Sequence, residues 1–420
     1  MQRPFSVPSL RLMATALRFL KLAFSRRYAS PRRILTVVVM LGVFGGVGAF
    51  VAVFRALDHV LYPGLRKARV EEPIFVIANP RSGTTFMHRL MCLDEERFTY
   101  FKLWQTMLPS VTLYRLVGAI AWADARVGRP LAWLLRRLEK VAFGGWDGVH
   151  AVGFERAEEE EMLFLTRLLT PSMFLFFPFG RDVRYADYID QLPDKKRKRL
   201  MRYYKESLRR HVFATGQGRA ILSKNVFFAG RMESILETFP DARFVHLVRH
   251  PYSAIPSLVS MFAAPWRFHS PEWEPTSEHH RYWSDLGIAY YKTYLTYADR
   301  IDPEQFIALT YDELVSDPRR TIERVYDQLE IPMSEAFRKR LDRETQRART
   351  YKSSHGYSLE EYGLDAQTIY EELRPVFERY GFDPQLGDEL EREDTHVGPT
   401  AKPQEGGARR PVASMVPAAS

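Results

Sequence analysis

The fold class of this 420-residue chain is decided by the stretch IFVIANPRSGTT, residues 74–85. Its first five residues are apolar, rich in β-branched side chains and bounded by prolines, which is typical of a strand buried on both faces. The residues that follow place Phe86, Leu90 and Leu93 at helical spacing. The stretch therefore predicts a buried strand, a tight loop and a helix in immediate succession.

The same kinds of element recur further along the chain. Residues 232–239 have apolar side chains on one helical face, and FVHLV at residues 244–248 predicts the next strand. A third predicted strand, residues 306–309, precedes a helix that places Ile322 and Val325 on one face. Alternating strands and helices favour a parallel sheet covered on both sides. We therefore expect an α/β fold of the P-loop-like type, with three layers and a central parallel sheet flanked by helices.

Other segments of the chain have less decisive patterns. Helices are expected at about residues 110–143, 158–169 and 195–214. Residues 264–283 hold three tryptophans among prolines and histidines, which predicts a loop that either covers an apolar or carbohydrate substrate or packs its rings. Residues 384–420 are rich in Pro, Gly, Ala and charge, which predicts a disordered tail.

The N-terminal end is basic and then strongly apolar. Residues 1–33 carry eight basic and no acidic side chains, and residues 34–54 carry no charge. At about 1.5 Å per residue, such a run roughly spans a bilayer core of about 30 Å. It predicts a transmembrane or inserted helix at 34–54, with a linker at 55–72; the alternatives are a buried core helix and a cleaved signal peptide. A basic segment beside such a run favours a membrane over nucleic acid as its partner.

Two features of the chain give opposite indications of its membrane topology. The excess of basic residues before the apolar run favours a cytoplasmic N-terminus and a catalytic part on the far side. However, Cys92 is the only cysteine and the chain has no Asn-x-Ser/Thr site, which favours a reducing compartment. A re-entrant hairpin, or an interfacial helix at residues 10–24, would keep the catalytic part on the cytoplasmic face. We favour the cytoplasmic face.

The loop at residues 79–85 is suited to holding a phosphate. Backbone N–H groups at the start of a helix bind anions. Gly83 lets the backbone approach closely, Thr84 and Thr85 offer hydroxyl groups, and Arg81 supplies a guanidinium fork. The spacing is shorter than in the nucleoside-triphosphate loop GxxxxGK[ST], and no lysine precedes the threonines.

PRSGTT, residues 80–85, resembles the loop with which sulfotransferases dependent on 3'-phosphoadenosine-5'-phosphosulfate (PAPS) bind the donor's 5'-phosphate. Their second motif has an arginine at the end of a strand and a serine eight residues later, as Arg249 and Ser257 are here, both reaching the 3'-phosphate. His250 replaces the usual Asp or Asn. Tyr311 is similar to a tyrosine near the adenine or the 3'-phosphate. The resemblance thus implies these PAPS-binding residues: Arg81, Ser82, Gly83, Thr84, Thr85, Phe86, Arg249, Ser257 and Tyr311.

The resemblance extends over a sulfotransferase domain expected at residues 73–383. Residues 223–225 are similar to the family's lysine strand, and residues 352–363 to its closing segment. The implied reaction moves a sulfuryl group from PAPS to a hydroxyl acceptor by in-line transfer, with Lys224 and Arg81 stabilising charge on the bridging oxygen. This reaction requires no metal, and we expect none.

The general base is not fixed by the resemblance. Many relatives carry a glutamate where this chain has Gln105, and an amide cannot accept the proton. The candidates are His150, whose imidazole has a near-neutral pKa, and Glu159 in the acidic run 158–161; we favour His150. The structural alternatives are a hydrogen-bonded histidine and an acidic run that forms the solvated first turn of a helix.

Two other functions are weighed against sulfuryl transfer. A P-loop nucleotide or small-molecule kinase shares the fold but needs the missing lysine. A catalytically inactive, membrane-bound nucleotide-binding protein would explain Gln105. For the enzyme, the acceptor is a lipid, glycan or small molecule, and attachment to a bilayer favours a lipid or glycolipid alcohol.

Overall fold

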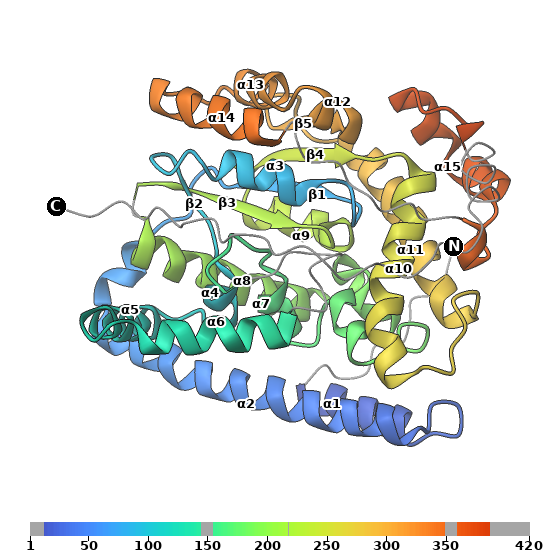
Figure 1. Ribbon diagram of the computed structural model, residues 1–420, viewed down its shortest axis with the longest axis horizontal. Helices are drawn as coiled ribbons and strands as arrows, with labels where there is room; N and C mark the ends of the chain where they lie inside the picture. Colours follow the sequence, from blue (N-terminus) through green and yellow to red (C-terminus); the bar gives the residue numbers. More distant parts are fainter. Residues whose placement is uncertain (1–11, 144–153, 217, 349–358, 387–420) are drawn as a thin grey trace, which may run out of the picture.

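A five-stranded parallel sheet lies at the centre of the molecule, in the order β2-β3-β1-β4-β5 (Figure 1). The computed structural model describes residues 12–143, 154–216, 218–348 and 359–386. The strands predicted at 74–78, 244–248 and 306–309 are confirmed. β2 was not predicted, because two residues show no periodicity. The strands are β1 (Ile74–Ala78), β2 (Phe98–Thr99), β3 (Ala220–Asn225), β4 (Arg243–Val248) and β5 (Phe306–Thr310).

Helices cover both faces of this sheet, as the sequence predicts. Val76 of β1 faces one hydrophobic cluster, and its neighbour Phe75 faces the other, because side chains alternate along a strand. The first cluster includes residues of α3 (Thr84–Met91), α12 (Tyr311–Ser316), α13 (Pro318–Gln328) and α14 (Glu335–Ala348). The second includes residues of α8 (Asp194–Thr215), α9 (Met232–Thr238), α10 (Pro251–His269) and α11 (Glu278–Ala298).

The loop expected at residues 264–283 is largely helical, so that prediction is wrong. α10 continues to His269 and α11 begins at Glu278. α10 contains two prolines, yet it continues because its aromatic side chains are buried in the core. Trp266 donates to the Phe174 carbonyl at 2.8 Å, and Trp283 stacks on Phe262. These two tryptophans therefore pack the core and do not form a lid.

Two further helix predictions are corrected by the structure. The segment 110–143 contains two helices, because Gly128 and Arg129 have left-handed backbone conformations that end the first one. Only Glu161–Leu165 is α-helical in the segment 158–169. Glu158 lies before that helix, and its N–H donates to the Phe101 carbonyl at 2.9 Å. The helices in this part of the chain are α4 (Leu103–Met107), α5 (Val111–Arg126), α6 (Pro130–Phe143) and α7 (Glu161–Leu165).

The N-terminal part forms α1 (Leu12–Ala23) and α2 (Pro31–Leu61), which extends beyond the predicted 34–54 at both ends. By length and composition α2 is apolar and long enough to cross a membrane. It runs along one side of the molecule (Figure 1). Only a narrow row of its side chains is buried there: Arg33, Val37, Phe44, Val51 and Asp58.

The C-terminal helix of the described chain is α15 (Ala366–Tyr380), which packs on α11. The predicted tail lies outside the described residues from 387 onward, as does much of the predicted closing segment, residues 352–358. The structure therefore leaves both predictions untested.

Candidate active site

The phosphate-type loop connects β1 to α3 and contains two left-handed residues. Arg81 has a φ of 72° and Gly83 a φ of 86°. A Cβ atom at position 83 would lie 2.7 Å from Cδ2 of Tyr311, so only glycine fits there. Left-handed residues at a turn let consecutive N–H groups converge on an anion. Thr84 and Thr85 begin α3 at the end of this loop.

The second motif contacts this loop directly. Arg249 donates from Nη1 to the carbonyl of Arg81 at 2.9 Å, and Arg81 donates from Nε to Oγ of Ser257 at 3.0 Å. The Arg249 guanidinium also lies 4.6 Å from the ring centre of Tyr311. The motifs meet because β1 and β4 are adjacent parallel strands, whose carboxyl ends lie at the same edge of the sheet. The structure thus brings together Arg81, Gly83, Arg249, Ser257 and Tyr311.

His250 has a structural position beside this cluster. Its Nδ1 accepts from the N–H of Tyr252 at 3.3 Å, in the first turn of α10. Burial lowers the pKa of His250, so its ring tends to be neutral. A neutral imidazole adds no charge beside Arg249.

Lys224 lies at the other side of the loop, on β3. Its Nζ is 3.2 Å from Oγ1 of Thr85, 3.4 Å from a carboxylate oxygen of Glu158 and 3.3 Å from one of Glu159. Burial lowers the pKa of Lys224, but the carboxylates of Glu159 and Glu158 outweigh it and raise the pKa above its usual value. The ammonium therefore stays charged although the side chain is fully buried.

The rest of the acidic run is bound to the same strand. Ser223 donates to Glu160, and Asn225 donates to Glu161. Tyr204 donates to Glu160 at 2.7 Å. Sequence reasoning missed this pairing of residues 158–161 with residues 223–225, because no periodicity connects two segments so far apart. The available signal was the uninterrupted row of four carboxylates, which is costly to bury without partners.

Burial raises the pKa of Glu160 to about 7, although its hydrogen bonds from Ser223 and Tyr204 oppose this shift. Burial also raises the pKa of Glu161, against the opposing charge of Arg231 at 3.3 Å. The alternative of a solvated acidic turn is wrong, because Glu158, Glu160 and Glu161 are buried.

Two further positions concern the choice of the general base. His150 lies outside the described residues. Gln105 is buried, and its Oε1 accepts from the N–H of Lys102 at 2.8 Å at the start of α4. Its amide thus has a structural contact. Within the described ranges, no group of three His, Cys, Asp or Glu side chains is placed to hold a metal ion.

The sequence pattern of the sulfotransferase family matches residues 73–335 of this chain. The chain belongs to the sulfotransferase family. It is thus a sulfotransferase, which moves a sulfuryl group to a hydroxyl acceptor, and the resemblance noted in the sequence is confirmed. The kinase and the inactive nucleotide-binding protein are set aside.

Individual relatives are bacterial sulfotransferases. Omega-hydroxy-beta-dihydromenaquinone-9 sulfotransferase Stf3 of Mycobacterium bovis is 25% identical over 323 residues, which cover 74% of this chain and 76% of the relative. The protein of the same name from Mycobacterium tuberculosis matches equally.

Solved structures of two sulfotransferases share the fold. The crystal structure of STF9 from Mycobacterium avium has a TM-score of 0.69 at 19% identity, covering 90% of this chain and 93% of that one. STF1 from Mycobacterium tuberculosis H37Rv has a TM-score of 0.59 at 17% identity, covering 88% and 99%. The predicted α/β architecture is therefore confirmed.

Proposed function

We propose that this sulfotransferase takes its sulfuryl group from PAPS, bound between the loop 79–85 and the pair Arg249 and Ser257. The observation that carries the proposal is the continuous contact from Arg249 through Arg81 to Ser257. The donor set fits a nucleotide with two phosphate ends, because guanidinium and hydroxyl groups form strong hydrogen bonds with phosphate.

Each end of the nucleotide has its own partners in this proposal. The loop and the first turn of α3 hold the 5' end, through Ser82, Thr84 and Thr85, with Phe86 beside them. Arg249 and Ser257 hold the 3'-phosphate. Tyr311 stacks beside Arg249, near the adenine or the 3'-phosphate.

Lys224 is the better supported of the two candidates for stabilising the leaving group. In the transfer step the acceptor oxygen bonds to sulfur, while the bond from sulfur to the bridging oxygen breaks and leaves negative charge on the phosphate. Lys224 carries a positive charge 3.2 Å from Thr85 of the phosphate loop. The Arg81 guanidinium contacts Ser257, which suits the 3'-phosphate end.

Glu159 is our proposed general base. It lies 3.3 Å from Lys224, and its side chain is 20% exposed, whereas that of Glu158 is 9% exposed. Glu158 also accepts from the N–H of Glu159 at 3.0 Å, which fixes it in place. The more accessible carboxylate is better placed to accept the acceptor's proton. His150, favoured by the sequence, stays the alternative prediction.

We propose that the acceptor is the hydroxyl group of a membrane lipid, reached on the cytoplasmic face. Two observations support this class. The relative Stf3 is named for a dihydromenaquinone alcohol, which is a lipid. The chain also carries one N-terminal helix with the length and composition of a membrane helix.

The test uses the full chain in vesicles with radiolabelled PAPS. We expect label in a lipid extract and none in water-soluble alcohols or sugars. Lys224→Ala should abolish labelling while the product nucleotide, adenosine 3',5'-bisphosphate (PAP), still binds in calorimetry. If the labelled product is only water-soluble, the lipid proposal is wrong. If PAP does not bind to the unchanged protein, the donor proposal is wrong.

A further inference from the structure

The exposed apolar side chains of this protein are concentrated in two segments. Among the described residues, every exposed large hydrophobic side chain except Phe268 and Val315 lies within residues 12–61 or 116–138. These segments contain α1, α2 and the hairpin of α5 and α6 (Figure 1). Soluble surfaces rarely expose large contiguous apolar areas, so this concentration indicates a partner.

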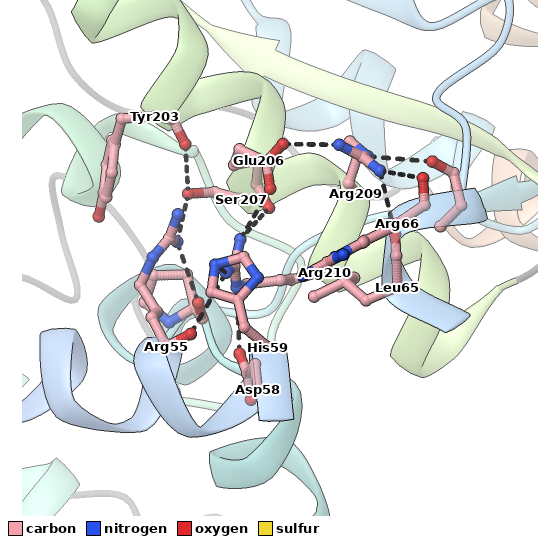
Figure 2. A network of polar contacts seen from close by, with 12 residues as sticks. Arg55, Asp58, His59, Leu65, Arg66, Tyr203, Glu206, Ser207, Arg209 and Arg210 are labelled. Carbon is pink, nitrogen blue, oxygen red and sulfur yellow. Dashed lines mark hydrogen bonds and ion pairs between the residues drawn. The ribbon is translucent and has the colours of Figure 1, made fainter. Parts of the chain in front are cut away.

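Both ends of α2 are bound to the globular domain. At its start, Arg33 donates from Nε to Oγ of Ser270 at 2.8 Å and forms an ion pair with Glu272. At its end, Asp58 accepts from Arg210 of α8 at 3.0 Å and from the N–H of Thr112 at 2.8 Å. Figure 2 shows the Asp58 end of this network.

These two contacts restrict how α2 can meet a bilayer. Arg33 and Asp58 are separated by about 38 Å of helix, which exceeds a hydrocarbon core of about 30 Å. If α2 crossed the membrane, the domain that binds both of its ends would have to lie beside it within the hydrocarbon, with Glu272 and Arg210 at opposite interfaces. Polar and charged groups of a domain within the hydrocarbon are costly. The geometry therefore favours an α2 that lies along the membrane surface.

The hairpin of α5 and α6 supplies a second apolar element. From Arg115 to Leu138, Asp124 is the only buried side chain, and it accepts from the N–H groups of Leu131 and Ala132, which holds the two helices together. Trp122 of α5 and Trp133 of α6 are exposed. Each tryptophan lies beside an arginine of its own helix, at 3.2 Å for Arg126 and 4.2 Å for Arg137.

We propose that α1, α2 and the hairpin of α5 and α6 form one surface that binds an anionic bilayer leaflet, with α2 in the plane of the membrane. The positive charge beside the apolar side chains favours an anionic leaflet as the binding partner of this surface. The first acidic residue of the chain is Asp58, and Lys21, Arg26 and Arg32 are exposed beside the apolar side chains. Exposed tryptophan and arginine are typical of side chains at the bilayer interface.

This surface is connected to the transfer site, by which we mean Lys224 and the carboxylates beside it. The hairpin follows α4, and the returning chain pairs with α4 through the N–H of Trp104 and the carbonyl of Phe154 at 3.3 Å. Four residues after Phe154 comes Glu158, in contact with Lys224. A hairpin bound to a leaflet thus holds the transfer site close to the membrane, a consequence that rests on the proposed lipid acceptor.

Depth measurements distinguish this arrangement from a membrane-crossing helix. A fluorescent label is attached to a cysteine introduced at Leu35, Val43 or Leu57, all exposed on α2, in the full chain bound to phosphatidylserine-containing vesicles. Quenchers at defined depths should report three similar, shallow positions, about 5 to 10 Å below the headgroups. A label at Val43 near the bilayer centre, with the other two labels at opposite interfaces, would overturn the proposal.

A variant pair tests the hairpin. Trp133→Asp should lower the affinity for these vesicles about tenfold in a sedimentation assay, because a negative charge replaces an interfacial aromatic ring. Phe268→Asp is the control, since Phe268 is 81% exposed but lies outside the surface. PAP affinity should stay unchanged in both, so failure here is distinct from failure of the proposed donor site. Equal sedimentation of the two variants, or a lipid-free dimer that covers the surface, would refute the leaflet as occupant.

Discussion

The guanidinium of Arg81 donates to the hydroxyl of Ser257 at 3.0 Å, although 176 positions separate the two residues. This contact joins the loop after β1 to helix α10, while Arg249 binds the carbonyl of Arg81 from the end of β4. The two motifs therefore position each other. Disturbing either one should affect binding at both ends of the nucleotide.

Replacing Arg249 should weaken nucleotide binding strongly. Hydrogen bonds to charged groups are worth about 1.5 to 3 kcal/mol, so Arg249→Ala should raise the Kd for PAP about 10- to 100-fold in calorimetry. Arg249→Lys should recover only part of this, because lysine lacks the planar fork. Arg243→Ala is the matched control, since Arg243 starts the same strand and pairs with Glu72. Equal losses in both alanine variants would contradict the assignment.

Gly83 should tolerate no side chain. Gly83→Ala adds a Cβ that would lie 2.7 Å from Tyr311, on a left-handed backbone, and should abolish PAP binding. Gly218→Ala has the same backbone cost, at a φ of 84°, but its Cβ would meet no atom within 4 Å. Its PAP affinity should stay near that of the unchanged protein. A Gly83→Ala variant with normal affinity would show that Tyr311 moves freely.

The order of elements around this loop could be predicted because local pattern and tertiary environment agree there. The residues of β1 are apolar on both faces, as a strand between two layers of helices requires. The span of α10 could not be predicted, since Pro265 is a local helix-breaking signal that the burial of Trp266 overrides. Local propensity is a weak guide where packing decides.

The contacts among the candidate site residues could be predicted where a sequence motif marks them, and were missed where only the fold brings the residues together. Arg249 and Ser257 are identifiable by their fixed interval, and their meeting with Arg81 follows from adjacent parallel strands. Three hydrogen-bond donors to Glu160 and Glu161 come from α8 and β3, which no local pattern links to the acidic run. Its four carboxylates suggested a solvated turn, but each has a polar partner in the structure.

Glu159→Gln should lower kcat by about 10² to 10⁴, the usual contribution of a general base, with little change in PAP affinity. The amide keeps the size of the side chain but cannot take the acceptor's proton. Single-turnover rates of sulfuryl transfer measure the effect. His150→Ala is the counterpart variant and should keep most of its activity. The reverse pattern would restore His150 as the base.

Glu160 should make stability depend on pH in a defined window. Because the folded-state pKa is raised from 4.5 to about 7, the folded protein holds this proton more tightly than the unfolded chain does. The contribution of Glu160 is therefore full below about pH 4.5 and is lost as the pH rises through about 7. Glu160→Gln should flatten the fall in the free energy of unfolding across this window, as measured by urea denaturation. An unchanged slope would contradict the raised pKa.

Asp58→Ala should destabilise the fold by about 3 to 5 kcal/mol, because it leaves the buried Arg210 without its carboxylate. Asp58 is fully buried and also binds the first turn of α5, whereas His59, which contacts Arg210 at 3.0 Å, is exposed (Figure 2). His59→Ala is therefore the control and should cost less than about 1 kcal/mol. The double variant Asp58→Ala with Arg210→Met should recover part of the loss, since no unpaired charge stays buried. Urea denaturation in detergent micelles measures these three variants and Arg210→Met alone. If the double variant is as unstable as the sum of its single variants, the ion pair is not what binds the end of α2 to α8.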